Sequence, residues 1–191
     1  MTQLSLSQGK YLELSGKTIP EYLTREEIEK LIKVVKKPHH HLLINFLWQT
    51  GARISEALAV EVKDIDFNSK EIKLITLKRK KITYRSVPLT DKLQSELAGY
   101  LYQKNLREGK IFKFSRQNAW AIIRKYFKLA DINKKPHPHI FRHSFAFNCS
   151  SQGLHPRLLQ RLLGHSNIVN TSIYYNPTQE FLKEQFLEIK F

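Results

Sequence analysis

The stretch TGARISEAL at positions 50–58 separates two helical patterns of different character. Residues 41–49, before it, are heavily apolar, so the helix they predict should lie in the core. Gly51 permits a turn into a short third helix over residues 53–60. Arg53 opens that helix, and Glu56 lies one turn later on the same face, where it can orient the guanidinium. The stretch predicts a cation at the end of a buried helix, although alone it also fits a surface helix with an internal ion pair.

Helical patterns recur on both sides of this turn. Thr24 and Glu27 have capping-box spacing ahead of a first helix that reaches about residue 37, and Pro38 is expected to end it. Thr90 and Ser115 are expected to cap helices that extend to residues 106 and 129. Further helices are predicted over residues 141–152, over residues 156–164 and over residues 178–191.

Between residues 64 and 87 the apolar period changes from helical to alternating. Strands are predicted over residues 64–67, 71–78 and 82–87, joined by Asn68-Ser69 and by the basic triplet at positions 79–81. The three strands should form a small antiparallel sheet. The fold class is therefore mixed but mainly α-helical.

Composition and charge narrow the functional class. The 191 residues are enough for one domain of medium size. They carry 32 Lys plus Arg against 17 Asp plus Glu, a net charge of +15 that favours a polyanion such as nucleic acid as partner. The single cysteine, Cys149, cannot form an internal disulfide, which fits the cytoplasm. We expect no membrane span, because no stretch of roughly 20 apolar residues occurs, and no signal peptide, because residues 1–10 are polar.

Two later segments place chemically useful side chains beside turns. In HPHIFRHSFA, at positions 137–146, helical spacing puts His139 and Arg142 side by side. In LLGHSNI, at positions 162–168, His165 follows a glycine, and Tyr174 comes nine residues later with Tyr175 beside it. Each segment alone is a weak signal, but the ordered set is far less probable by chance than any one member.

Taken in order, with the basic hairpin that ends in VPL at positions 87–89, these segments resemble the catalytic domain of the tyrosine recombinase, or phage integrase, family. The resemblance runs from about Leu23 to the C-terminus and implies that family's α+β, mainly α-helical fold. Residues 1–22 are then an arm or linker and residues 23–177 the catalytic domain. Residues 178–191 form a C-terminal helix that relatives often exchange between subunits.

The resemblance implies a site-specific recombinase that cuts and rejoins DNA strands through a covalent 3′-phosphotyrosine, in integration, excision or inversion, without cofactor or metal. Lys80 and Lys81 remain alternatives to Lys78 as the hairpin lysine, and Tyr175 remains an alternative to Tyr174. Arg79, Lys80 and Lys81 are expected to contact DNA. Carried over residue by residue, the catalytic set comprises Arg53, Lys78, His139, Arg142, His165 and Tyr174, with Glu56 behind it as an aligning group.

The residue types suit this chemistry. A phosphotyrosine keeps the energy of the broken phosphodiester, so no high-energy cofactor is required. A phenol with an ordinary pKa of about 10 needs a base or a cationic site to attack at neutral pH, and His139 is the candidate base. Arg53 and Arg142 can clamp the non-bridging oxygens, and His165 would add a hydrogen bond. Lys78 is suited to protonate the leaving 5′-oxygen.

The expected partner is double-stranded DNA. The protein is expected to be a monomer in solution and a tetramer on paired DNA sites. Accessory DNA-bending proteins and association with the nucleoid are further expectations. Type IB topoisomerase-like relaxation and a non-catalytic DNA-binding regulator stay open as alternatives. The run His39-His40-His41 is assigned no metal, because consecutive residues of a helix point in different directions. His143 is predicted to be a packed structural residue. The short lead-in cannot build the N-terminal domain of most relatives, which fits either a compact enzyme or a catalytic fragment.

Overall fold

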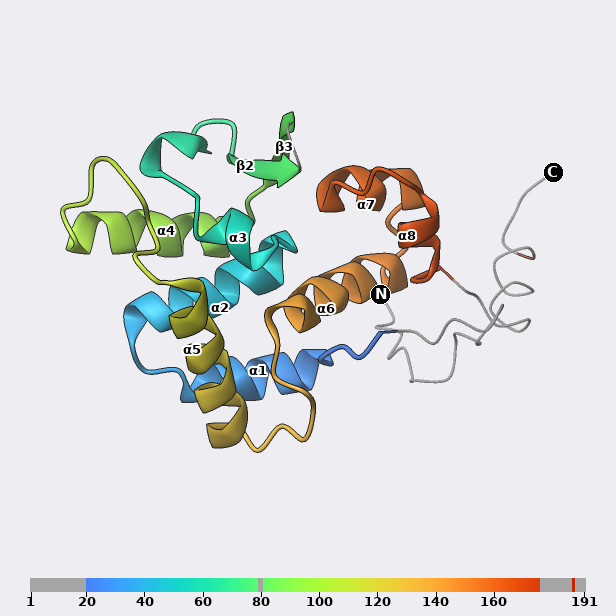
Figure 1. Cartoon of the computed structure of the whole chain (residues 1–191), viewed down its shortest axis with the longest axis horizontal. Coiled ribbons are helices and arrows are strands. Elements are labelled where there is room, and N and C mark those ends of the chain that lie inside the picture. Colours follow the sequence, from blue (N-terminus) through green and yellow to red (C-terminus); the bar gives the residue numbers. More distant parts are fainter. Residues whose placement is uncertain (1–19, 79–80, 176–186, 188–191) are drawn as a thin grey trace.

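The computed structural model describes residues 20–78, 81–175 and 187. Over these residues the chain is mainly α-helical with one three-stranded antiparallel sheet, which confirms the predicted fold class (Figure 1). Within the described part, no helix combines the length and apolarity that a membrane crossing requires. The elements are α1 (Arg25–Val34), α2 (Pro38–Thr50), α3 (Ile54–Ala57), the 3₁₀ turn η1 (Val62–Asp64), β1 (Ile65–Asp66), β2 (Glu71–Lys78), β3 (Lys81–Pro88), α4 (Asp91–Gln103), α5 (Arg116–Leu129), α6 (Pro138–Ser151), α7 (Pro156–Leu163) and α8 (Val169–Ser172).

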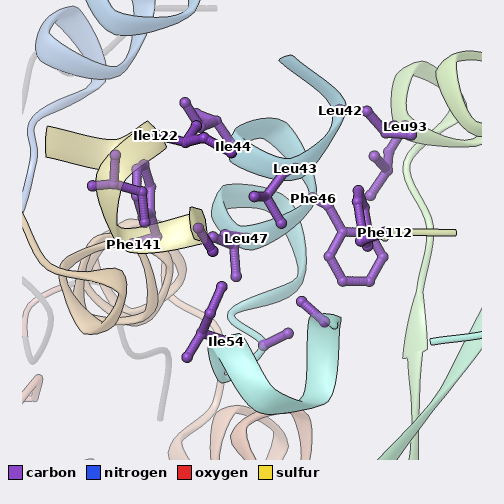
Figure 2. Packing of buried hydrophobic residues seen from close by; sticks show 14 of the residues in the cluster. Leu42, Leu43, Ile44, Phe46, Leu47, Ile54, Leu93, Phe112, Ile122 and Phe141 are labelled. Carbon is purple, nitrogen blue, oxygen red and sulfur yellow. The ribbon is translucent and has the colours of Figure 1, made fainter. Parts of the chain in front are cut away.

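Helix α2 is the centre of the main core. Its apolar residues lie on all sides rather than along one stripe, so neighbouring elements must cover it all round. Figure 2 shows Phe46 beside Phe112 on one side and Ile44 beside Ile122 on the opposite side. The rings of Phe46 and Phe112 lie 5.3 Å apart in an edge-to-face arrangement. Because α2 is held on all sides, the turn at its C-terminal end is fixed, and with it the start of α3.

Two prolines begin helices that we predicted to start later. We expected Pro38 to end the first helix, but α1 ends at Val34 and Pro38 is the first residue of α2. Likewise α6 begins at Pro138 rather than at residue 141. Proline is well tolerated at the first helical position, because the N–H that it lacks has no partner within the helix there. This correction places His139 in the first turn of α6.

The predicted N-caps are confirmed. Thr24 and Glu27 form a complete capping box, and Thr90 and Ser115 accept hydrogen bonds from the first turns of α4 and α5. Three helix ends were predicted three residues too late, since α1, α3 and α4 stop at Val34, Ala57 and Gln103. The ends of α6 and α7 were predicted one residue too late. The short helix α8 was not predicted.

The sheet has the order β1-β2-β3, and β2 has the bounds that were predicted. Ile72 pairs with Val87 and Leu74 pairs with Arg85. Ile72, Leu74 and Val87 are buried. Side chains alternate along a strand, so Thr76 and Arg85 face the same side as these apolar residues. The inner face of the hairpin thus ends in polar groups, where it meets α3 and α7.

Helices α6, α7 and α8 form a second region beside the main core (Figure 1). Five buried residues make up its apolar cluster: Phe145, Ala146, Leu159, Leu163 and Tyr174. Of the helix predicted over residues 178–191, the structure describes only Leu187, so that prediction lies outside the described residues.

Candidate active site

Arg53 and Glu56 form the first part of the site, at the start of α3. The Arg53 backbone N–H donates to Glu56 Oε2 at 2.8 Å, and Arg53 Nη1 donates to Oε1 at 2.8 Å. Glu56 is 2% exposed, whereas the Arg53 side chain is 24% exposed. The buried carboxylate therefore holds Arg53 from the protein interior, and the guanidinium still reaches solvent. The predicted orientation of Arg53 by Glu56 matches this geometry.

Arg85 is a third arginine of the site that sequence reasoning missed. Its Nη1 and Nη2 donate to the two oxygens of Glu56 at 2.9 and 2.7 Å, a bidentate pair. Its Nε donates to the Leu162 carbonyl at 2.7 Å, and Thr76 Oγ1 donates to Glu56 Oε1 at 2.6 Å. Arg85 thus ties β3 to both α3 and α7. The signal was present, because strand alternation places Arg85 on the same face as the buried Val87.

These partners keep Glu56 ionised. Burial opposes ionisation, but the hydrogen bonds and positive charge of Arg85, with the Thr76 hydroxyl and the Arg53 backbone N–H, lower the pKa of Glu56 to about 2. Glu56 therefore carries a full negative charge at neutral pH. It offsets one of the positive charges around it.

Arg142 joins the two regions of the molecule. It is 4% exposed, and its Nη1 and Nη2 donate to the carbonyls of Gly51 and Leu163 at 2.8 and 2.5 Å. Neither partner is a carboxylate. Burial, followed by the positive charges of Arg53 and Arg85, lowers the pKa of Arg142 to about 9. The guanidinium stays charged at neutral pH at a cost in free energy that a bound anion would offset.

Two glycines permit this close packing. Gly51 has a φ of 60°, and a Cβ there would lie 2.5 Å from the Phe145 ring. Gly164 has a φ of 64°, and a Cβ there would lie 3.1 Å from Arg85 Cδ. Both positions adopt the left-handed conformation that favours glycine, and Gly51 also needs the missing side chain, which explains the glycine in TGARISEAL and in LLGHSNI.

The two predicted histidines lie on different elements, His139 in α6 and His165 after α7. His139 is exposed in the first turn of α6, and partial burial, followed by the charge of Arg142, lowers its pKa. His165 follows the C-cap of α7, and its Nδ1 lies 2.9 Å from the hydroxyl of the buried Thr171. That contact fixes the His165 ring, since a second hydrogen bond on an imidazole sets its orientation.

Tyr174 and Tyr175 are placed differently. Tyr174 is 3% exposed, and its hydroxyl lies 2.7 Å from Nδ1 of His143, the residue after Arg142. Tyr175 instead donates to the Leu154 carbonyl. Burial raises the pKa of Tyr174 to about 12, and the charge of Arg142 acts in the opposite direction. The contact of Tyr174 with α6 favours it over Tyr175, and it gives His143 a partner that sequence reasoning did not foresee.

The hairpin lysines are described only in part. The β2–β3 ladder extends to the pair Lys78–Lys81, so both backbones lie at the mouth of the turn. Arg79 and Lys80 lie outside the described residues. The choice between Lys78, Lys80 and Lys81 stays a prediction.

The consecutive histidines of α2 have separate partners. His40 Nδ1 lies 3.0 Å from the Tyr126 hydroxyl, and His41 Nδ1 lies 2.5 Å from Glu96 Oε1. The His39 ring lies 5.7 Å from that of Phe114. Within the described ranges, no group of three or more His, Cys, Asp or Glu side chains gathers in a way that could hold a metal ion.

Comparison with known proteins places the chain in a family. Residues 21–180 match the profile of the phage integrase family. The chain belongs to the phage integrase family. A tyrosine recombinase of Pseudothermotoga lettingae is 35% identical to this family member over 168 residues, which cover 85% of the chain and 58% of the relative. The chain thus spans about three fifths of the length of that relative.

Solved structures of the family share the fold. The crystal structure of XerA recombinase matches with a TM-score of 0.75 at 25% identity, covering 92% of this chain and 68% of that one. The Tn1549 transposon integrase matches with a TM-score of 0.70 at 23% identity, covering 88% and 67% of the two chains. This integrase-family domain therefore has the tyrosine recombinase catalytic fold that its sequence motifs implied.

Proposed function

We propose that this domain is the catalytic domain of a site-specific recombinase, which cuts and rejoins double-stranded DNA through a covalent 3′-phosphotyrosine on Tyr174. One observation carries the proposal. Arg53 follows the turn between α2 and α3, and Arg142 of α6 donates to the Gly51 carbonyl in the same turn. The residue after Arg142 in α6, His143, contacts the hydroxyl of the buried Tyr174. An anion site and a nucleophile are thereby joined through one helix.

The charge balance of the site favours a phosphate. Three arginines, Arg53, Arg85 and Arg142, surround one carboxylate, Glu56, so three positive charges minus one negative charge leave +2. A phosphodiester carries one negative charge and gains another as a fifth oxygen attaches to phosphorus. Guanidinium groups suit this change, because their planar donors can bind two oxygens at once.

In the proposed reaction, the Tyr174 oxygen attacks phosphorus and the bond from phosphorus to the 5′-oxygen breaks. A hairpin lysine, Lys78 in our assignment, protonates the leaving oxygen. Arg53, Arg142 and His165 stabilise the pentavalent state, with His139 close to the same phosphate. Reversal with the 5′-hydroxyl of another strand rejoins the DNA, and no cofactor is consumed.

DNA is the polyanion that best fits the chain's net charge of +15. The Tn1549 integrase, which has this fold, was solved in complex with circular intermediate DNA. We expect Arg79, Lys80 and Lys81 to contact the DNA backbone. Recombination cuts both strands of two duplexes, so four subunits should act together. We expect monomers to assemble into this tetramer on paired DNA sites. DNA-bending proteins would assist the assembly, which would take place on the nucleoid.

An exposed apolar groove supports an exchange of the proposed helix over residues 178–191 between subunits. A groove of about 900 Å³ runs between β3 and α7 and is lined by Leu158, Leu162 and Tyr84, of which Leu158 and Tyr84 are exposed. We propose that the helix of a second copy occupies this groove in the assembled tetramer. Deletion of residues 178–191 should abolish pairing of two DNA sites in a gel-shift assay, and unchanged pairing would contradict this exchange.

Covalent trapping tests the proposed function directly. A pool of nicked duplexes with randomised sequence lets the enzyme select its own site, and the nick prevents rejoining. The unmodified chain and Tyr175→Phe should form an adduct that survives denaturing electrophoresis, whereas Tyr174→Phe should form none. Arg142→Ala should lower the rate of adduct formation about 10²- to 10³-fold, the usual loss for a transition-state donor.

Two outcomes would favour the alternatives. An adduct lost only in Tyr175→Phe would show that the neighbouring tyrosine is the nucleophile. The absence of any adduct would favour a non-catalytic DNA-binding regulator. Relaxation of a supercoiled plasmid without strand exchange between two sites would instead favour a topoisomerase.

A further inference from the structure

The hydroxyl of Tyr174 lies on a histidine that has no role in the proposed reaction so far. The Oη–Nδ1 distance to His143 is 2.7 Å, and among the described residues no second hydrogen-bond partner of this hydroxyl occurs. Tyr174 is 3% exposed, and a buried hydroxyl needs an acceptor for its proton. The phenol therefore donates to Nδ1, and the ring proton of a neutral His143 belongs on Nε2.

The surroundings of His143 keep its ring neutral. Burial, followed by the positive charges of His139, His137 and Arg142, lowers the pKa of His143 to about 4. Its Nδ1 is thus unprotonated at neutral pH and free to accept a proton from the phenol. His139, our predicted base, lies one turn earlier on α6, and its ring centre is 6.4 Å from that of His143.

We propose that His143 is the catalytic residue that accepts the phenol proton when Tyr174 attacks the scissile phosphate. The inference rests on the proposed function and deepens it. As the bond from oxygen to phosphorus forms, the phenol proton moves to Nδ1 and gives an imidazolium. The bond from phosphorus to the 5′-oxygen breaks, and that oxygen takes its proton from the hairpin lysine. On rejoining, the imidazolium returns its proton to the released phenol.

The same contact keeps the nucleophile inactive without DNA. With pKa values of about 12 for Tyr174 and about 4 for His143, the proton stays on the phenol in the free protein. A phosphate between Arg53 and Arg142 changes the balance, because its negative charge stabilises an imidazolium beside it. Bond formation to phosphorus at the same time makes the phenol more acidic. Proton transfer is then coupled to the arrival of the substrate.

Two replacements separate proton transfer from simple positioning. Asparagine can place an amide oxygen near the position of Nδ1 and accept the hydrogen bond, but it cannot take the proton. Alanine removes both abilities and leaves space for added imidazole. His39→Ala is the matched control, since His39 is a partly buried histidine at the far end of α2.

The measurement is the initial rate of adduct formation on the nicked duplex pool, with DNA binding and thermal unfolding recorded for each variant. His143→Ala and His143→Asn should both be slower by about 10²- to 10³-fold, a usual loss for a general base. Added imidazole should restore part of the rate of His143→Ala but none of Tyr174→Phe. DNA binding should be unchanged, and His39→Ala should react like the unmodified chain. Because rescue requires a folded site, it also separates lost chemistry from misfolding.

Several results would overturn the inference while the proposed function stands. If His143→Asn reacts as fast as the unmodified chain, the histidine only positions the phenol. If His143→Ala reacts as fast or faster, the contact is dispensable or merely restrains the tyrosine. A slow His143→Ala that imidazole does not rescue also contradicts proton acceptance. An unmodified chain that forms no adduct, or an adduct that survives Tyr174→Phe, contradicts the proposed function itself, and the inference with it.

Discussion

The two regions of this integrase-family domain are stabilised in different ways. The core around α2 includes buried apolar residues from each of the helices α1 to α6 and from the sheet. Among the described residues, the cluster of α6, α7 and α8 has five buried members, one of which is the proposed nucleophile. Arg53 and Glu56 lie on the larger core, whereas His165 and Tyr174 belong to the smaller cluster. Among the described residues, Arg53, a proposed phosphate ligand, thus lies on the more extensively packed region, and the proposed nucleophile lies in the smaller one.

Polar contacts join the two regions at the site itself. Arg142 binds carbonyls on both sides, Gly51 at the end of α2 and Leu163 at the end of α7. Arg85 connects Glu56 with the Leu162 carbonyl in the same way. The residues that would bind a phosphate therefore also set how α7 sits against the core. In the proposed reaction, binding of DNA would alter the position of Tyr174 through the same contacts.

The largest expected effect is a loss of unfolding free energy, compared between the two regions by one Leu→Ala substitution in each. Leu43 and Leu159 are both fully buried leucines, in α2 and α7. Leu43→Ala should lower the free energy of unfolding by about 3–5 kcal/mol, because the crowded core cannot collapse around the cavity. Leu159→Ala should cost about 2–3 kcal/mol, since the smaller cluster can adjust. Urea unfolding gives both values.

Hydrogen exchange adds a local test to the same pair. Leu159→Ala should speed exchange in α7 without affecting α2, whereas Leu43→Ala should speed exchange throughout. Equal losses of unfolding free energy with identical exchange patterns would show that the regions form one cooperative unit. The contrast drawn between them would then be wrong.

The next effect tests the polar connection. Arg85→Met leaves the buried Glu56 without its bidentate partner and should cost about 3 kcal/mol of unfolding free energy. Replacing Glu56 by Gln in the same chain removes a buried negative charge that would keep Arg53 but lose Arg85 as its ion-pair partner, and it should recover part of the loss. Chemical denaturation of the two single variants and the double variant measures this coupling. Strictly additive losses would mean that Arg85 does not act through Glu56.

Local signals in the sequence predicted most of the elements. Thr24, Thr90 and Ser115 cap helices where their spacing indicated, and the bounds of β2 were predicted correctly. Helix starts at Pro38 and Pro138 were missed, because proline was interpreted as a stop although it also suits a first turn. A helix cap depends on side chains within one turn, so it can be predicted from local sequence. Whether a proline follows one helix or begins the next depends on how the two helices pack.

The site residues were predictable as types but not in all their contacts. Motif spacing indicated Arg53, Arg142 and Tyr174, and the structure brings the elements that carry them together. Arg85 could have been found from strand alternation. The contact between His143 and Tyr174 joins residues 31 positions apart, in α6 and after α8, so no local pattern could have indicated it.

Acid should destabilise the folded state over two overlapping pH ranges. Glu56 has a folded pKa of about 2 against an ordinary value of 4.5, so its stabilisation is complete above pH 4.5 and is lost as the pH falls towards 2. The expected loss is about 2–3 kcal/mol. The pKa values of His40 and His143 are also lowered, from 6.5 to about 4, so the folded state loses further stability between pH 6.5 and 4.

Glu56→Gln distinguishes the two ranges. This variant should lose the share of the dependence below pH 4.5 that Glu56 supplies, while other carboxylates with a lowered pKa, such as Glu96, keep theirs. It should keep the dependence between pH 6.5 and 4, as measured by urea unfolding at a series of pH values. If the variant and the unmodified chain show the same loss below pH 4.5, other carboxylates dominate acid unfolding. Glu56 would then not be the ionised centre of the connection.

The smallest expected effect concerns the uncompensated positive charge. Sulfate should bind between Arg53 and Arg142 and stabilise the folded state by about 1 kcal/mol, since a ligand that binds only that state shifts unfolding. The unfolding temperature should then rise by about 2–4 °C relative to chloride at equal ionic strength.

Sulfate also stabilises proteins in general, so the informative quantity is a difference between variants. Arg53→Met should lose the specific part of the increase, whereas Arg124→Met, which removes an exposed arginine of α5, should keep it. Equal increases in both variants would mean that the site does not bind an anion in the absence of DNA. A difference would show that Arg53 belongs to an anion site that is stabilised by the kind of charge that the proposed substrate brings.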